Sequence, residues 1–224
     1  MKKTAPRRKR PSKKELHRKL LRAAADAHVP RRKLRIELVP KPLHGENLRK
    51  LADKHHWGKL RARLLEGHPL KCDICVGSVE KSSQLNAHEN WDYYVSEWPA
   101  LNVLSGISFV CGLCHSAEHF MHTQILVQDG KLDPGYLDDV IEHYCRVNKV
   151  TSKTFFRDLE SACERWERLS ELEWLTHFGE YSEWLLEVLD KRAATLKRLN
   201  ELDAQRGNAA ASKSSKALGS KRVS

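Results

Sequence analysis

The sequence of 224 residues lacks long hydrophobic runs, and its mean hydropathy is −0.61. No window approaches the run of about 18 apolar residues that a membrane-spanning helix needs, so we expect no membrane segment. Further basic residues follow Met1-Lys2-Lys3 in place of the apolar stretch of a secretory signal. We therefore expect a cytoplasmic protein, in which thiols stay reduced and cysteine pairs indicate a metal rather than disulfides.

The sequence also lacks an internal repeat and a GxxxxGK[ST] phosphate loop, so any nucleotide-driven step would need another protein. Its apolar fraction of 40% lies slightly below the globular average, and its charged fraction of 31% lies above it. This composition is sufficient for a hydrophobic core but not for a chain that is compact throughout. One domain with tails, or two small domains, fits the length.

Charge is present in excess, and it is unevenly distributed. Residues 1–71 contain 23 Lys and Arg but only 6 Asp and Glu, a net charge of +17, whereas the remainder carries −6. A basic N-terminal third suits a polyanion, so we expect nucleic-acid contacts from its residues. A solvated tail or an acidic protein partner would explain the same charge. The expected contact residues are Arg7, Arg8, Lys9, Arg10, Lys13, Lys14, Arg31, Arg32 and Lys33.

Periodicity divides the chain into four regions. Residues 1–33 form a basic tail that is disordered or becomes helical on a phosphate backbone. The region 34–125 begins with an alternation at 34–39 that predicts a short strand, and 46–66 predicts two short helices separated near Gly58. The third region, 126–202, is predicted to be helical. The fourth, 203–224, is predicted to be a disordered tail.

The C-terminal helical region contains two amphipathic stretches. Tyr136 to Val147 follows Asp133-Pro134, which resembles an N-cap and a first-turn proline. A long helix is predicted from Thr151 or Ser152, with an interruption at Gly179. These helices either pack on the rest of the chain and on each other, or form a hairpin that binds a protein partner or dimerises.

Four of the six cysteines form two CxxC pairs. Each pair places two thiolates on one metal from a tight turn, and two pairs complete a tetrahedral site suited to Zn²⁺. Such a closed site holds the fold together and performs no chemistry. The predicted zinc ligands are Cys72, Cys75, Cys111 and Cys114.

Three histidines lie beside these pairs. If Cys114 leads into a helix, His115 and His119 share one face and can bind one metal ion. His88, from a strand packed against that helix, would complete a three-histidine site with open positions for water. An ion held in this way could stabilise the charge of a scissile phosphate. The alternative is that these are surface histidines.

The layout Cys72-x-x-Cys75, Ala87-His88-Glu89, Cys111-x-x-Cys114-His115 and His119 resembles the HNH (His-Me finger, ββα-metal) endonucleases in their zinc-knuckled version. The similarity covers 34–185 and is greatest to a bacterial and phage subgroup. It implies an α+β fold with a ββα-metal core flanked by helices, which encloses a catalytic divalent ion such as Mg²⁺. It also implies hydrolysis of phosphodiester bonds in DNA, assisted by a general base.

Two departures from the family pattern bear on activity. The family usually has a histidine base after the first metal ligand, and that position is Glu89 here. In the alternative register, His88 is the base and the metal loses a ligand. The asparagine that orients the base is replaced by Gly106. The sequence therefore predicts a metal-dependent DNA endonuclease or nickase, with a degenerate nucleic-acid-binding or adaptor protein as the alternative.

Overall fold

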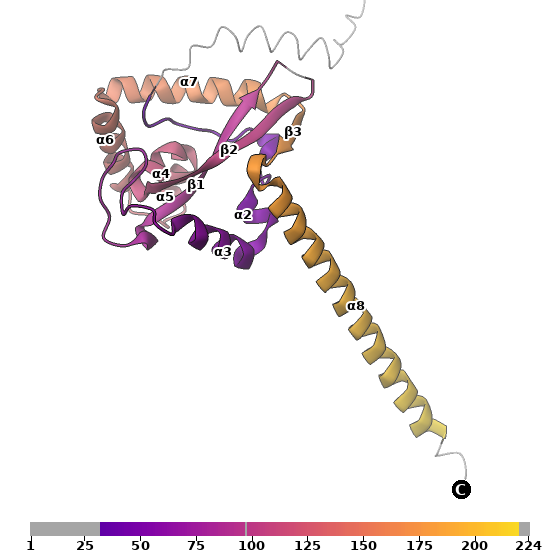
Figure 1. Cartoon of the computed structure of the whole chain (residues 1–224). Helices are drawn as coiled ribbons and strands as arrows, with labels where there is room; N and C mark the ends of the chain where they lie inside the picture. The colour runs from indigo at the N-terminus through magenta and orange to yellow at the C-terminus, as the bar shows by residue number, and fades with distance from the viewer. Residues whose placement is uncertain (1–31, 97, 220–224) are drawn as a thin grey trace, which may run out of the picture.

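The computed structural model describes residues 32–96 and 98–219, which form a three-stranded sheet and a set of helices (Figure 1). The predicted α+β class with a helical majority is confirmed. The strands are β1 (Leu85–Tyr94), β2 (Ala100–Cys111) and β3 (Trp174–His177). The helices are α2 (Leu48–Leu51), α3 (Asp53–Leu65), α4 (Gly112–Glu118), α5 (Phe120–Gln128), α6 (Tyr136–Asn148), α7 (Ser152–Ser170) and α8 (Ser182–Gly219), with 3₁₀ turns at Lys41–Leu43, Ser82–Gln84 and Gly179–Tyr181.

The sheet has the order β1-β2-β3. The long strands β1 and β2 form an antiparallel hairpin with a bulge after Asn90, which lies opposite Gly106. The short strand β3 pairs parallel to β2. Periodicity does not predict β3, because a four-residue edge strand is too short to show an alternating pattern.

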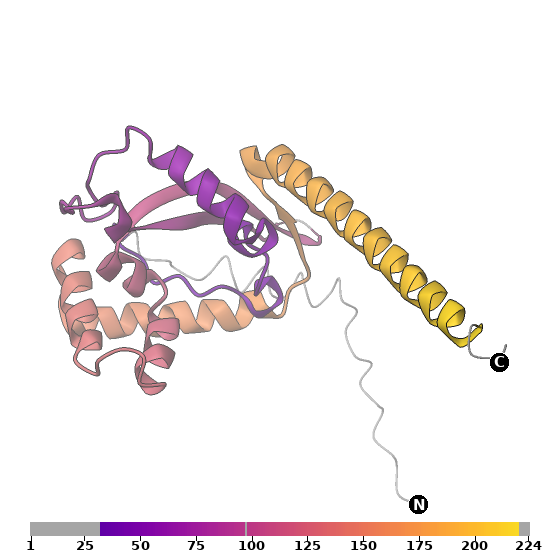
Figure 2. The same cartoon turned by 90° about the horizontal axis from the view of Figure 1, so that it is seen from below.

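Hydrophobic residues pack on both faces of the hairpin. On one face, Val110 of β2 shares a buried cluster with Phe120, Tyr144 and Phe155, so helices α4 to α7 cover that side (Figures 1 and 2). On the other face, Leu104 packs with residues of α2, α3 and the beginning of α8. The first cluster joins residues from the predicted regions 34–125 and 126–202, which therefore share one hydrophobic core.

Helix α6 begins and ends close to the predicted positions. The Asp133 carboxylate accepts a hydrogen bond from the Gly135 amide at 2.8 Å, just before the first turn. At the other end Lys149 adopts a left-handed conformation, with φ of 54°, which terminates the helix. The strong apolar periodicity of this stretch explains why its sequence was sufficient to predict it.

The predicted strand at residues 34–39 is absent, because the backbone of this segment finds other partners. The Asn148 side chain accepts from the Leu34 amide at 3.0 Å and donates to the Leu34 carbonyl at 2.9 Å. The Glu37 amide donates to the carbonyl of Glu118 at the end of α4. Leu34 is buried in the core, so the alternating pattern reflects burial rather than pairing in a sheet.

The predicted pair of helices in 46–66 is present, but the break is not at Gly58. It falls at Asp53, whose φ of 68° is left-handed and whose carboxylate accepts from the His55 and His56 amides. Gly58 continues inside α3, and a Cβ at this position would meet nothing within 4 Å. The capping contacts of Asp53 therefore set the boundary between the two helices, and the low helix propensity of Gly58 does not.

Helix α8 is the longest element, and the end of the expected tail at 203–224 lies outside the described residues. The helix continues to Gly219, beyond the last apolar residue of the stripe at Leu202. Alanine and lysine have high intrinsic helix propensity, which supports helix without an apolar face. In the described part of the chain no helix is long and apolar enough to cross a membrane.

Candidate metal centres

The four cysteines of the CxxC pairs converge, and their sulfur atoms lie within 4.8 Å of one another. Cys72 and Cys75 lie in a tight turn in which the Val76 amide donates to the Cys72 carbonyl at 2.9 Å. Cys111 ends β2 and Cys114 lies in the first turn of α4. This cluster is consistent with the predicted structural Zn²⁺.

Asp73 fixes the first turn to the strand that carries the second pair. Its carboxylate accepts from the Phe109 amide at 2.6 Å, and its own amide donates to the Phe109 carbonyl at 2.9 Å. His68 contacts the other carboxylate oxygen at 3.1 Å. These bonds hold the two cysteine pairs together, although Cys75 and Cys111 are 36 positions apart in the sequence.

Three of the four sulfurs influence one another's protonation. Hydrogen bonds from Cys111 and Cys114 lower the pKa of Cys72, so one thiolate is stable in the cluster. The neighbouring Cys111 and Cys72 sulfurs then raise the pKa of Cys114. Four thiolates at this separation require a positive ion to balance their charge, as Zn²⁺ does.

His143, which sequence reasoning missed, is a buried partner of this cluster. Its Nε2 lies 3.1 Å from the Cys114 sulfur, and its Nδ1 lies 3.0 Å from the Arg146 guanidinium. Arginine can only donate, so Nδ1 accepts and Nε2–H donates to the sulfur. Burial, together with Arg146, lowers the pKa of His143 and keeps its imidazole neutral. This donor suits a metal-bound thiolate, and it ties α6 to the cysteine cluster.

The three predicted metal-binding histidines also converge. His88 projects from β1, while His115 lies in α4 and His119 follows its last residue. One nitrogen from each ring lies within 4.8 Å of the others, and the ring centroids are 4.8–5.8 Å apart. Burial is the main cause that lowers the pKa of His115 to about 4 and that of His119 to about 3, so both are neutral at pH 7.

Two carboxylates face His88, and sequence reasoning missed both. Glu118 Oε2 lies 3.4 Å from His88 Nδ1, and Glu37 Oε2 lies 3.9 Å from Nε2. Burial acts to lower the pKa of His88, but these carboxylates outweigh it and the pKa is raised. Burial also raises the pKa of Glu118 to about 7. The only signal in the sequence was the position of Glu118 within the stretch from His115 to His119.

Several buried atoms at this cluster have no hydrogen-bond partner. Among the described residues, buried side-chain atoms of this kind include both ring nitrogens of His88 and the Oε2 atom of Glu118. Burying polar atoms without partners is costly, and a metal ion or water would satisfy them. The residues therefore fit a metal ion.

Glu89 is not brought to the histidine cluster. Consecutive residues of a strand point to opposite faces, and Glu89 points away from the His88 side chain. Its carboxylate accepts from the amides of Leu48 and Arg49 at 3.2 and 3.4 Å, at the beginning of α2. Burial raises the pKa of Glu89, despite these hydrogen bonds. Its observed contacts are those of a cap for α2.

Most of the predicted nucleic-acid contacts lie outside the described residues. Of the described ones, Arg32 forms a 2.6 Å ion pair with Asp158, which also accepts from the Tyr144 hydroxyl at 3.0 Å. Its guanidinium is therefore engaged within the fold. Lys33 is exposed. The predicted contacts outside the described residues are Arg7, Arg8, Lys9, Arg10, Lys13, Lys14 and Arg31.

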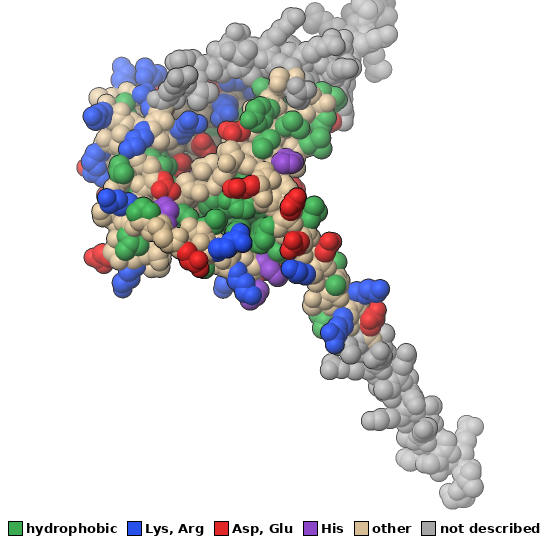
Figure 3. All heavy atoms as spheres, in the orientation of Figure 1, with side chains coloured by type: hydrophobic (Ala, Val, Ile, Leu, Met, Phe, Trp, Pro, Cys, Tyr) green, Lys and Arg blue, Asp and Glu red, His purple; other side chains and the backbone are tan. Residues whose placement is uncertain are grey.

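Other basic side chains surround the histidine cluster. Arg49 and His122 act electrostatically on His115, and Arg35 acts on Glu118. These residues come from three separate segments, so no local basic run in the sequence identifies them. In the orientation of Figure 3, basic side chains also cover other parts of the body.

No family model, curated protein or solved structure compared with this chain gives a match. The resemblance to HNH endonucleases therefore rests on the motifs and on one coarse geometric feature. That feature is a four-cysteine cluster and a histidine cluster beside a β-hairpin that is followed by helices.

Proposed function

We propose that this protein is a metal-dependent phosphodiesterase that cleaves or nicks DNA at the histidine cluster. The observation that carries the proposal is the convergence of His88, His115 and His119 beside a separate cysteine cluster. A protein that only binds nucleic acid has no need for three convergent imidazoles next to a cluster that already serves to hold the fold.

The set of donor atoms indicates the class of ion. Three imidazole nitrogens suit Zn²⁺, Ni²⁺ or another transition metal better than Mg²⁺, which prefers oxygen ligands. The bound ion would supply charge stabilisation at the scissile phosphate and its leaving oxygen. His115 and His119 would bind it as neutral ligands, consistent with the lowered pKa of each.

The remaining residues have positioning roles in this proposal. Glu118 Oε2 lies 3.4 Å from His88 Nδ1, and its carboxylate would orient that ring, as carboxylates commonly do behind metal-binding histidines. Glu89 caps α2 and so keeps Arg49 near the cluster. The positive charges of Arg49 and Arg35 would attract the phosphate backbone.

The test is plasmid nicking by the purified full chain, with Zn²⁺, Ni²⁺, Mn²⁺ or Mg²⁺ added singly. We expect cleavage with a transition metal and its loss in His88→Ala and His115→Ala. A matched control is His55→Ala, which changes an exposed histidine of α3 outside the cluster. Metal content per chain, measured by mass spectrometry of the elements, should fall by one ion in the two cluster variants only.

The degenerate scaffold is the second candidate, and the capping contacts of Glu89 and the glycine at position 106 favour it. It predicts DNA binding that weakens with salt and no strand breaks with any of the four ions. Cleavage that persists in both His88→Ala and His115→Ala would instead show that the site is elsewhere.

A further inference from the structure

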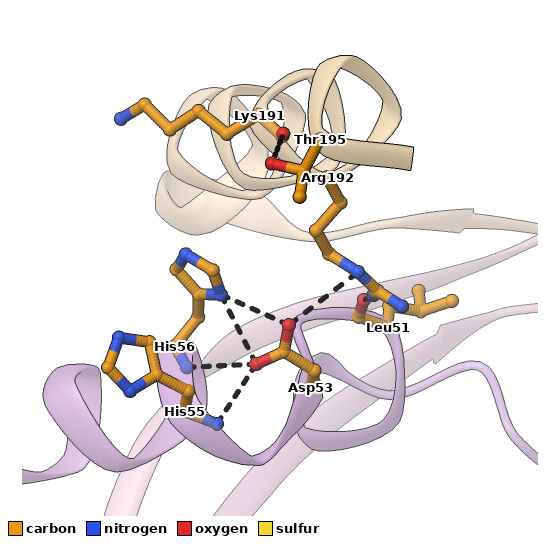
Figure 4. Close-up of polar contacts among 7 residues, drawn as sticks. All are labelled: Leu51, Asp53, His55, His56, Lys191, Arg192 and Thr195. Carbon is orange, nitrogen blue, oxygen red and sulfur yellow. Dashed lines mark hydrogen bonds and ion pairs between the residues drawn. The ribbon is translucent and has the colours of Figure 1, made fainter. Parts of the chain in front are cut away.

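Helix α8 leaves the body of the protein after its first turns (Figures 1 and 2). Leu185 and Val188 are buried against α2 and α3. Arg192 makes the last described polar contacts with the body, with the Leu51 carbonyl and, at 3.6 Å, with the Asp53 carboxylate (Figure 4). All described side chains from Ala193 to Glu201 are exposed.

Helix α8 carries a row of exposed leucines, two of them before Arg192 and two in the part beyond it. Leu186, Leu189, Leu196 and Leu199 are exposed by 62%, 37%, 59% and 51%. Their spacings of three, seven and three residues place them along one broad side of the helix. At about 100° per residue, Leu185 falls between Leu196 and Leu199, so the row continues beyond the body the apolar side that Leu185 and Val188 bury, with Leu186 at its edge. Leucines repeated at such spacing are typical of helices that pack against another helix.

Charge along the same helix is segregated. Residues 183–190 contain three acidic and no basic side chains, whereas 191–198 contain four basic and no acidic ones. Figure 3 shows acidic groups where α8 leaves the body, and basic groups together with an acidic one further along. The charged residues are Glu183, Glu187, Asp190, Lys191, Arg192, Lys197 and Arg198.

We propose that α8 pairs in antiparallel orientation with α8 of a second copy of this chain. A two-fold axis near residues 192 and 193 would place Leu186 opposite Leu199 of the second copy, and Leu189 opposite Leu196 of the second copy. The acidic half of each helix then lies beside the basic half of the other. A parallel pair would place like charges together, so the charge pattern selects the antiparallel one.

The first test is the mass of the full chain in solution, measured by sedimentation equilibrium over a range of concentrations. We expect a dimer, and we expect Leu196→Ser combined with Leu199→Ser to raise the dissociation constant by at least about tenfold. Phe156→Ser, at an equally exposed residue of α7, is the control and should leave the dimer intact. A wild-type monomer at every concentration would overturn the proposal.

The second test addresses orientation by oxidative cross-linking, with the wild type as the control for the native cysteines. Ala193→Cys, near the axis, should form a disulfide-linked dimer readily. Leu186→Cys should not, because the antiparallel arrangement places the two copies of this residue far apart. Efficient cross-linking at residue 186 but not at 193 would show a parallel pair and contradict the proposal. Neither test depends on nuclease activity.

Discussion

The cysteine and histidine clusters, the two candidate metal centres, both take residues from helix α4, but their surroundings differ. The cysteine cluster consists of four identical donors, two of which, Cys72 and Cys114, belong to the main hydrophobic core. The histidine cluster combines three imidazoles with the carboxylates of Glu37 and Glu118, and it includes buried atoms without hydrogen-bond partners. A metal site whose four coordination positions are all filled by protein ligands stabilises the fold. A site with three protein ligands keeps a coordination position open for water or substrate, and is therefore suited to chemistry.

The largest effect should come from the cysteine cluster. Cys72→Ser removes one ligand of a site whose binding energy is folding energy, so we expect the body to lose its cooperative thermal transition. The free energy of unfolding of a typical domain, about 5–15 kcal/mol, is comparable to what a structural zinc supplies. Calorimetry and zinc content provide the measurement. Cys163→Ser, which is outside the cluster, is the matched control, and a normal transition in Cys72→Ser would contradict the structural role.

A smaller effect on the same cluster should follow from His143→Phe. The ring volume is largely retained, but the N–H that donates to the Cys114 sulfur is lost. Partners of this kind typically contribute 10–100-fold to metal affinity, so we expect zinc affinity to fall by about that factor. Competition with a chromogenic chelator measures it. Unchanged affinity would show that His143 only fills space.

The histidine cluster should respond to Glu118→Gln without unfolding. The amide keeps the shape of the side chain but removes the charge that faces His88. We expect affinity for a transition metal at this cluster to fall by about tenfold, while zinc remains on the cysteines. Calorimetric titration with Ni²⁺ measures the loss. An equal loss of zinc from the cysteines would show that the two clusters are not independent.

Arg32→Ala separates the stabilising role of this residue from its predicted role in nucleic-acid binding. The change leaves Asp158, which is 7% exposed, without its cation, so we expect a loss of about 1–3 kcal/mol in the free energy of unfolding. Denaturant titration measures the loss, and the double variant with Asp158→Asn should lose less than the sum. Reduced DNA affinity with unchanged stability would instead support direct contact with the phosphate backbone.

The smallest effect should come from Gly106→Asn, which introduces at this position the amide expected from the resemblance to HNH endonucleases. A Cβ at this position meets nothing within 4 Å, so we expect stability to change by less than about 1 kcal/mol. The nicking assay then shows whether this amide is what the histidine cluster lacks. A large loss of stability would mean that residue 106 has a steric role.

The sequence by itself determined the features that depend on local spacing. Two CxxC pairs predicted the cysteine cluster, and the separation of His115 from His119 predicted two rings on one side of a short helix. The apolar period of α6 also predicted that helix nearly to its ends. Local spacing is sufficient in these cases because the covalent chain fixes the distances between residues a few positions apart.

Only the tertiary structure decided which other groups reach these clusters. His143, Glu37 and the parallel strand β3 come from distant segments, and no spacing links them to the residues they contact. Likewise, only the structure shows that the Glu89 carboxylate contacts the amides at the beginning of α2. Long-range packing satisfies buried polar groups with whatever residues the fold brings together, so these contacts leave no periodic pattern in the sequence.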